Sequence, residues 1–169
     1  MKKIFLLFLL AISFSACEKD DICIDETTPR LVLEFYDDAS PANTKNVTGL
    51  KIKGEGAIGD LVLGTFSGVS KIYLPLKTND DITKYSLILN SASTNPLVIN
   101  EDFLQFNYTR ENFYVSRACG YKTIFELLSF PAGVIQTEPE TPDLPWIRSY
   151  SIQTTNIETE NEVHIKIYF

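Results

Sequence analysis

The sequence predicts an all-β fold, most simply an antiparallel β-sandwich of immunoglobulin-like or transthyretin-like arrangement, with a small β-barrel as the alternative. Short runs of β-branched and aromatic residues recur along the chain, separated by turn residues, and no segment has a helical period. At 169 residues, with 44% hydrophobic and 22% charged residues, the chain has an ordinary globular composition. One domain with a real core is therefore expected.

Each expected strand is a short run that ends at a turn signal. The first, Leu-Val-Leu-Glu-Phe-Tyr, stops at Asp37 and Asp38, and the third stops at Pro75. Glycines at 54, 56 and 59 separate two other runs. The expected strands are residues 31–36, 47–53, 71–74, 84–90, 103–108, 113–117, 123–130, 146–157 and 163–169.

Two hairpins are predicted. In the central one, residues 103–108 and 113–117 pair across a turn at 110–112, and Cys119-Gly120 marks a bulge. The last hairpin turns at 158–161 and ends in residues 163–169, which alternate between an apolar and a polar face.

Residues 131–145 contain four prolines and three acidic residues, so they are predicted to form a stiff, solvated loop. The loop is long for a connection within one domain, a length that is typical of functional or mobile segments.

The first sixteen residues are expected to be an export signal. Lys2 and Lys3 precede an apolar run, residues 4–14, that is too short to span a membrane. Ser15-Ala16-Cys17 resembles the lipobox of bacterial lipoproteins, which implies that Cys17 is lipidated and becomes the first mature residue. The alternative is ordinary signal cleavage that leaves Cys17 unmodified. The expected divisions are a signal peptide at 1–16, a lipidated tether at 17–27 and one domain at 28–169.

The tether begins with Glu18, Lys19, Asp20 and Asp21. A lysine followed by acidic residues after the lipidated cysteine is similar to the surface-export signal of Bacteroidota lipoproteins. This resemblance implies an outer-membrane protein that faces the cell exterior; a solvated acidic tether on the periplasmic face is the alternative. Removing residues 1–16 changes the net charge from −7 to −9, which argues against nucleic acid as a partner.

If Cys17 carries lipid, Cys23 and Cys119 remain as a pair in an oxidising compartment. A disulfide between them would fasten the tether to the middle of the domain. The alternatives are two buried free thiols or half of a metal site, although a metal site needs more ligands than the sequence offers nearby.

No residue pattern predicts catalysis, a metal or a cofactor. His164 is the only histidine; it falls on the polar face of the last strand, where an exposed structural role is expected. Residues 54–59 match the spacing of a dinucleotide-binding loop, but the residues after them are not helical, so a turn is expected. Paired aspartates at 37–38 and 80–81 are expected in solvated turns.

Three aromatic residues lie beside predicted loops or on faces that the pattern leaves open: Tyr121, Trp146 and Tyr150. They are candidates for a platform on which a sugar or a partner protein stacks. The alternative is that they belong to the core or its rim.

Residues 17–23, 28–37 and 114–125 resemble a family of uncharacterised small lipoproteins from Bacteroidota. The resemblance implies a lipid anchor and one compact domain, and it implies no activity. The expected function is a non-enzymatic, membrane-anchored module that binds or scaffolds an envelope protein or glycan. One alternative is a pilin-like subunit assembled by strand exchange, with residues 163–169 as the displaced edge strand. The other is a carbohydrate-active enzyme that uses a carboxylate pair.

Overall fold

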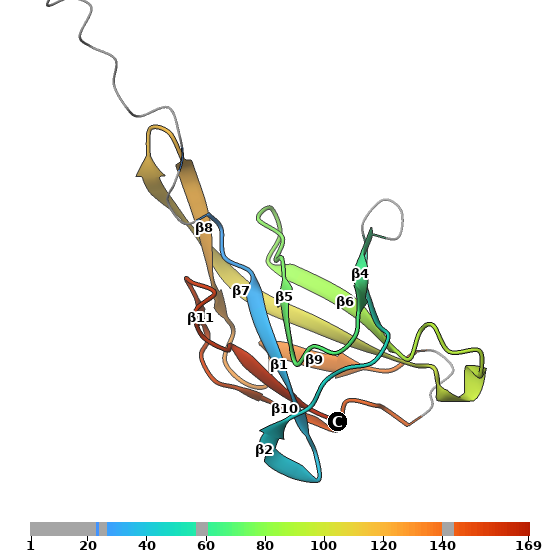
Figure 1. The fold of residues 1–169 in the computed structure, drawn as a ribbon. Coiled ribbons are helices and arrows are strands. Elements are labelled where there is room, and N and C mark those ends of the chain that lie inside the picture. Colours follow the sequence, from blue (N-terminus) through green and yellow to red (C-terminus); the bar gives the residue numbers. More distant parts are fainter. Residues whose placement is uncertain (1–22, 24–26, 57–60, 140–143) are drawn as a thin grey trace, which may run out of the picture.

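Two β-sheets packed face to face form the protein in a computed structural model (Figure 1). The structure describes residues 23, 27–56, 61–139 and 144–169. Over these residues the chain is all-β except for one 3-10 turn, η1 (Pro96–Val98), and neither sheet closes into a barrel. The predicted sandwich is therefore confirmed.

The first sheet has five strands and is mixed. Its order is β10-β12-β1-β2, and β5 also pairs with β1 beside β2. The only parallel pair in it joins β1 to β12, and the other pairs are antiparallel. The strands are β1 (Leu31–Asp37), β2 (Ser40–Thr44), β5 (Lys71–Leu74), β10 (Ser149–Ile152) and β12 (Ile165–Tyr168).

The second sheet has seven strands, and all of its pairs are antiparallel. Its order is β11-β8-β7-β6-β3-β4, with β9 beside β7. The strands are β3 (Leu50–Gly54), β4 (Leu61–Phe66), β6 (Ile82–Leu89), β7 (Asn100–Ser116), β8 (Gly120–Leu127), β9 (Val134–Thr137) and β11 (Asn156–Ile157).

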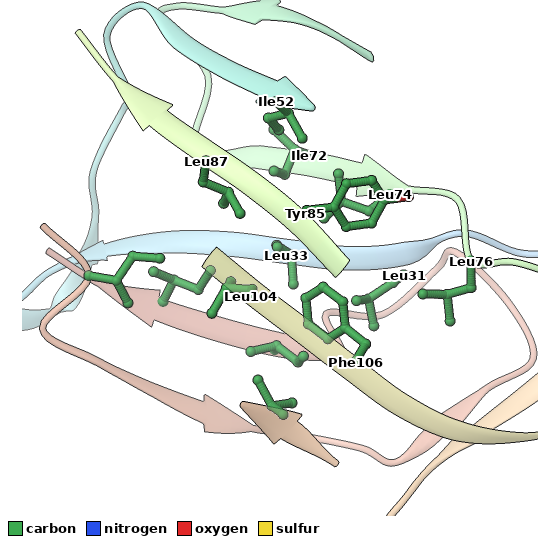
Figure 2. Close-up of a cluster of buried hydrophobic side chains, with 14 of the residues drawn as sticks. Leu31, Leu33, Ile52, Ile72, Leu74, Leu76, Tyr85, Leu87, Leu104 and Phe106 are labelled. Atoms are coloured by element: carbon green, nitrogen blue, oxygen red, sulfur yellow. The ribbon is translucent and has the colours of Figure 1, made fainter. Parts of the chain in front are cut away.

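The core lies between the two sheets (Figure 2). Leu31 and Leu33 of β1 face Leu104 and Phe106 of β7, and all four side chains are buried. Alternate residues of each strand enter this layer because strand side chains point to opposite faces in turn. Burial of so many leucine, isoleucine and phenylalanine side chains supplies the main driving force for folding.

The predicted central turn at 110–112 is wrong. β7 runs through these residues without interruption for 17 residues, and the chain reverses at 117–119 instead. The ladder extends to Tyr114 opposite Tyr121 and Ser116 opposite Gly120, with the irregularity between Tyr114 and Ser116. Gly120 has a φ of +69°, a left-handed conformation that glycine adopts without steric cost.

The proline-rich loop is only partly a loop. Residues 134–137 form β9, which pairs with β7 from Phe103 to Phe106. The segment is also held by Asp102, whose buried carboxylate accepts a hydrogen bond of 2.8 Å from the backbone N–H of Ile147. Proline content predicted the irregular stretches but not the short strand between them.

The glycine-rich stretch connects β3 to β4, an antiparallel pair in which Gly54 is opposite Leu61. A strand, β4, follows this stretch in place of the helix that a nucleotide-binding loop needs, and residues 57–60 lie outside the described residues. Neither β4 nor β2 is among the strands expected from the sequence.

The last strand lies inside its sheet. β12 pairs in parallel with β1, Leu33 opposite Ile165, and antiparallel with β10, Tyr150 opposite Ile167. The prediction that residues 163–169 form an edge strand is therefore wrong. Displacing β12 would break hydrogen bonds on both of its sides, which removes the basis for strand exchange at this position.

Candidate functional site

Polar side chains line several hollows on the surface of the described residues, and two of these hollows are candidate binding sites. The first, called here the Arg30 cleft, has a volume of about 410 Å³ and lies between the segment that leads into β1 and the turn that precedes β12. Its lining is mostly hydroxyl, amide and charged groups, supplied by Thr27, Thr28, Pro29, Arg30, Glu158, Thr159, Glu160 and Asn161.

A bidentate ion pair spans the Arg30 cleft. The Arg30 guanidinium donates from Nε and Nη2 to the two carboxylate oxygens of Glu160, at 2.7 and 2.6 Å, and the Arg30 backbone N–H donates to Oε1 at 3.0 Å. Hydrogen bonds from Arg30 hold the pKa of Glu160 below its ordinary value, and the same contact raises the pKa of Arg30. The polar groups of the cleft are thus largely committed to each other.

His164 lies behind this cleft and is fully buried, so the expectation of an exposed histidine is wrong. Its Nδ1 accepts a hydrogen bond of 2.8 Å from the backbone N–H of Val32. Burial lowers its pKa, while Glu162, the Thr159 backbone and Glu160 act in the opposite direction. A buried, neutral imidazole whose acceptor nitrogen is occupied is a structural group and has no access to a substrate.

The second hollow, called here the Phe130 groove, has a volume of about 480 Å³. It combines an exposed ring, Phe130, which is 78% exposed, with an exposed cation, Arg148. The half-buried residue Tyr150 and its neighbours Ser149 and Ser151 also line the groove. Gln136 and Ile152 complete the lining.

The three candidate aromatic residues lie in three different parts of the structure and do not form one platform. Trp146 belongs to the core: it is 7% exposed, its Nε1 donates to the Leu87 carbonyl at 3.1 Å, and its ring contacts Phe35 and Phe169. Its candidacy as a binding residue is wrong because the second sheet covers it.

Tyr150 lies on β10 in the Phe130 groove, where its hydroxyl donates to the Val134 carbonyl at 2.8 Å. The sequence gives no signal for Phe130, because this residue stands at the end of an apolar run that has the pattern of a strand.

Tyr121 is 71% exposed near the end of the β7–β8 hairpin, where it packs edge to face against Tyr114, with ring centroids 5.4 Å apart. Tyr114 is itself 57% exposed. Sequence reasoning missed Tyr114 because it placed the turn too early; a turn at 117–119 would have put these two tyrosines opposite each other.

A disulfide joins Cys23 to Cys119, with Cα atoms 4.8 Å apart, as the cysteine count predicted. Cys119 lies in the turn between β7 and β8, so the bond attaches the tether to the end of that hairpin. Cys17 and the tether residues 18–21 lie outside the described residues.

Three of the aspartates that were expected in solvated turns form ion pairs. Asp37 contacts Lys45 at 3.2 Å, Asp80 contacts Lys77 at 3.5 Å, and Asp81 contacts Arg110 at 2.6 Å. Within the described residues, no three metal-ligating side chains gather in one place, and no helix has the length and apolarity needed to cross a membrane.

Comparison with known families gives one match, and comparisons with curated proteins and with solved structures give none. Residues 49–169, which include both strands of the β7–β8 hairpin and the Phe130 groove, match a family of unknown function, DUF6452. The chain therefore belongs to this family. Cys23, β1 and Arg30 precede the matched residues.

Proposed function

We propose that this member of the DUF6452 family is a lipoprotein, anchored through Cys17 in a bacterial outer membrane, whose sandwich is a non-enzymatic binding module for an envelope protein or glycan. The observation that carries the proposal is the Cys23–Cys119 disulfide. Disulfides persist in oxidising compartments, so the bond supports export, as does the lipobox-like Ser15-Ala16-Cys17. A cytosolic enzyme would need neither feature.

In this proposal the anchor consists of two or three acyl chains on Cys17, the number that bacterial lipoproteins carry. One acyl chain holds a protein only marginally, and two or more hold it stably. The acidic tether then carries the domain to the cell exterior, and display on the periplasmic face is the alternative.

The Phe130 groove is the binding surface that best fits a glycan. An exposed ring offers its face to the C–H groups of a sugar, and the nearby guanidinium and hydroxyls suit the sugar's oxygens. The Arg30 cleft fits less well because a ligand would have to displace a bidentate ion pair.

Protease added to intact cells tests display. If the domain faces outward, it is shaved from wild-type cells, and a variant with Lys19, Asp20 and Asp21 replaced by alanine is protected. Protection in both strains would place the domain in the periplasm. Mass spectrometry of the mature N-terminus tests the anchor, since an unmodified Cys17 would contradict it.

Binding to an array of bacterial surface oligosaccharides tests the groove. We expect Phe130→Ala and Arg148→Ala to lose at least tenfold in affinity for any oligosaccharide that the wild type retains. Phe113→Ala is the matched control, since it removes an exposed phenylalanine outside the groove. Equal binding by all four proteins would exclude the Phe130 groove.

A further inference from the structure

The distal part of the β7–β8 hairpin extends beyond the rest of the second sheet. β6 pairs with β7 only up to Asn107, β9 pairs only with Phe103–Phe106, and β11 pairs with β8 only at Phe125 and Glu126. Residues 111–124 are therefore a two-stranded ribbon, which projects away from the sandwich in Figure 1. A ribbon of two strands is marginally stable alone in water. This one is held by the Cys23–Cys119 disulfide and by the hydrogen bond of 3.0 Å that the Thr123 N–H donates to Thr28 Oγ1.

The ribbon end is unusually aromatic for an exposed segment. Tyr114, Tyr121 and Phe113 are 57%, 71% and 44% exposed. Tyr114 and Tyr121 are opposite each other on one face, whereas Phe113, opposite Lys122, points to the other face. Residues 113–122 contain two basic residues, Arg117 and Lys122, and no acidic residue, in a chain whose net charge is −7.

Aromatic groups on both faces indicate what covers them. A protein partner laid against one face of the ribbon would leave the aromatic residues of the other face in water. A layer that the ribbon enters end-first surrounds both faces. Tyrosine is enriched at the membrane–water interface, where its ring sits at the level of the lipid headgroups.

The disulfide places this end beside the proposed anchor. Five residues lie between Cys17 and Cys23, so the chain between the two cysteines spans at most about 20 Å. Cys23 is bonded to Cys119 in the turn of the ribbon, one residue before Gly120 and two before Tyr121. The lipid on Cys17 therefore cannot lie far from the ribbon end.

We propose that the end of the β7–β8 hairpin inserts into the headgroup layer of the bilayer that holds the anchor, with Tyr114, Tyr121 and Phe113 as the contacting side chains. The inference rests on the lipidation of Cys17. Tyr114 and Tyr121 lie within about 10 Å of the turn along their strands, which matches the depth of an interfacial layer, and Phe113 lies one residue farther from the turn. The hairpin and the acyl chains then hold the sandwich in one orientation above the membrane.

The test uses the full-length lipidated protein in vesicles of phosphatidylethanolamine with a minority of phosphatidylglycerol, made with and without bromine on the acyl chains. Bromine quenches tryptophan fluorescence at short range. The only native tryptophan, Trp146, is buried in the core, so the wild type gives the baseline. Tyr121→Trp places a probe at the ribbon end. Leu97→Trp is the matched control, since Leu97 is 91% exposed and precedes the opposite end of β7, about 50 Å away along the strand.

We expect brominated lipid to reduce the added fluorescence of Tyr121→Trp at least twofold and to leave Leu97→Trp and the wild type unchanged. Equal signals for both variants, in protein that floats with the vesicles and carries lipid on Cys17, would overturn the insertion and leave the anchor intact. Absence of lipid on Cys17 in the mass spectrum would overturn both. Replacing Cys23 and Cys119 by serine in the Tyr121→Trp protein should weaken the quenching, and undiminished quenching would contradict the role of the disulfide.

Discussion

The Nδ1 atom of His164 accepts a hydrogen bond of 2.8 Å from the backbone N–H of Val32 inside the core of the first sheet. The backbone of His164 also donates to the Val32 carbonyl at 3.1 Å. One residue at the entry to β12 thereby holds both backbone groups of a residue in β1. These bonds lie at the start of the parallel pair and fix its register.

Acidification is expected to destabilise the protein through His164. Its pKa in the folded state is lowered from the ordinary value of 6.5, so the unfolded state binds a proton that the folded state does not. The free energy of unfolding should therefore be constant above pH 6.5 and fall as the pH drops below it. Urea denaturation at a series of pH values between about 7.5 and 5.5, the range in which histidine titrates, measures how the free energy of unfolding changes with pH.

His164→Asn is the control for that slope, because an amide oxygen can take the place of Nδ1 as acceptor and does not titrate. The variant should lose the pH dependence in this range. The pKa of Glu160 is lowered from 4.5, so the stability that this carboxylate contributes is lost only below the pH range of the experiment. Glu160 therefore does not add to the slope measured between about pH 7.5 and 5.5. An unchanged slope in His164→Asn would exclude His164 as its source.

Removal of the disulfide should lower the free energy of unfolding. Cys23 and Cys119 are 96 positions apart, and loop-closure entropy gives about 5 kcal/mol as an upper value for a loop of this size. We expect a loss of about 2–4 kcal/mol for Cys119→Ser in urea denaturation. The double variant Cys23→Ser/Cys119→Ser should lose no more than the single one, and additive losses would mean that the two thiols act separately.

Asp102 should be more important to stability than other acidic residues, because its buried carboxylate accepts the Ile147 N–H and holds the segment around Trp146 against β7. Asp102→Ala leaves a buried donor without its acceptor, which costs about 1–3 kcal/mol. Asp102→Asn keeps an acceptor oxygen and should cost less. Thermal denaturation of both variants decides the matter, and equal melting temperatures for Asp102→Ala and wild type would refute the assignment.

The Arg30–Glu160 pair should contribute little to stability despite its geometry. The two side chains are 50% and 30% exposed, and water screens pairs of this kind. A double-mutant cycle with Arg30→Ala and Glu160→Gln should give a coupling of about 1 kcal/mol or less. The pair of Lys45 and Asp37, which has a single contact at 3.2 Å and similar exposure, provides the comparison and should couple less strongly.

The local sequence pattern was sufficient to predict the fold class, and the number of cysteines was sufficient to predict which two of them pair. Alternation and turn residues identify strands because the period of two is a property of the strand itself, so β1, β3, β5, β6 and β8 were found near their observed bounds. The disulfide followed from counting, since only two cysteines remain if Cys17 is lipidated.

Tertiary structure alone decided what covers each face and which strands are neighbours. The alternation placed His164 on a polar face, but this residue, directly before β12, is buried, and its imidazole and backbone N–H are both bonded to the backbone of Val32 in β1. Trp146 entered the core because Asp102 and Leu87, distant in sequence, bind its segment. The 17-residue β7 crosses a favourable turn signal at Arg110–Asn112, since pairing with β8 satisfies its backbone groups without a break. Local sequence sets the period of a strand, and partners far along the chain set its burial.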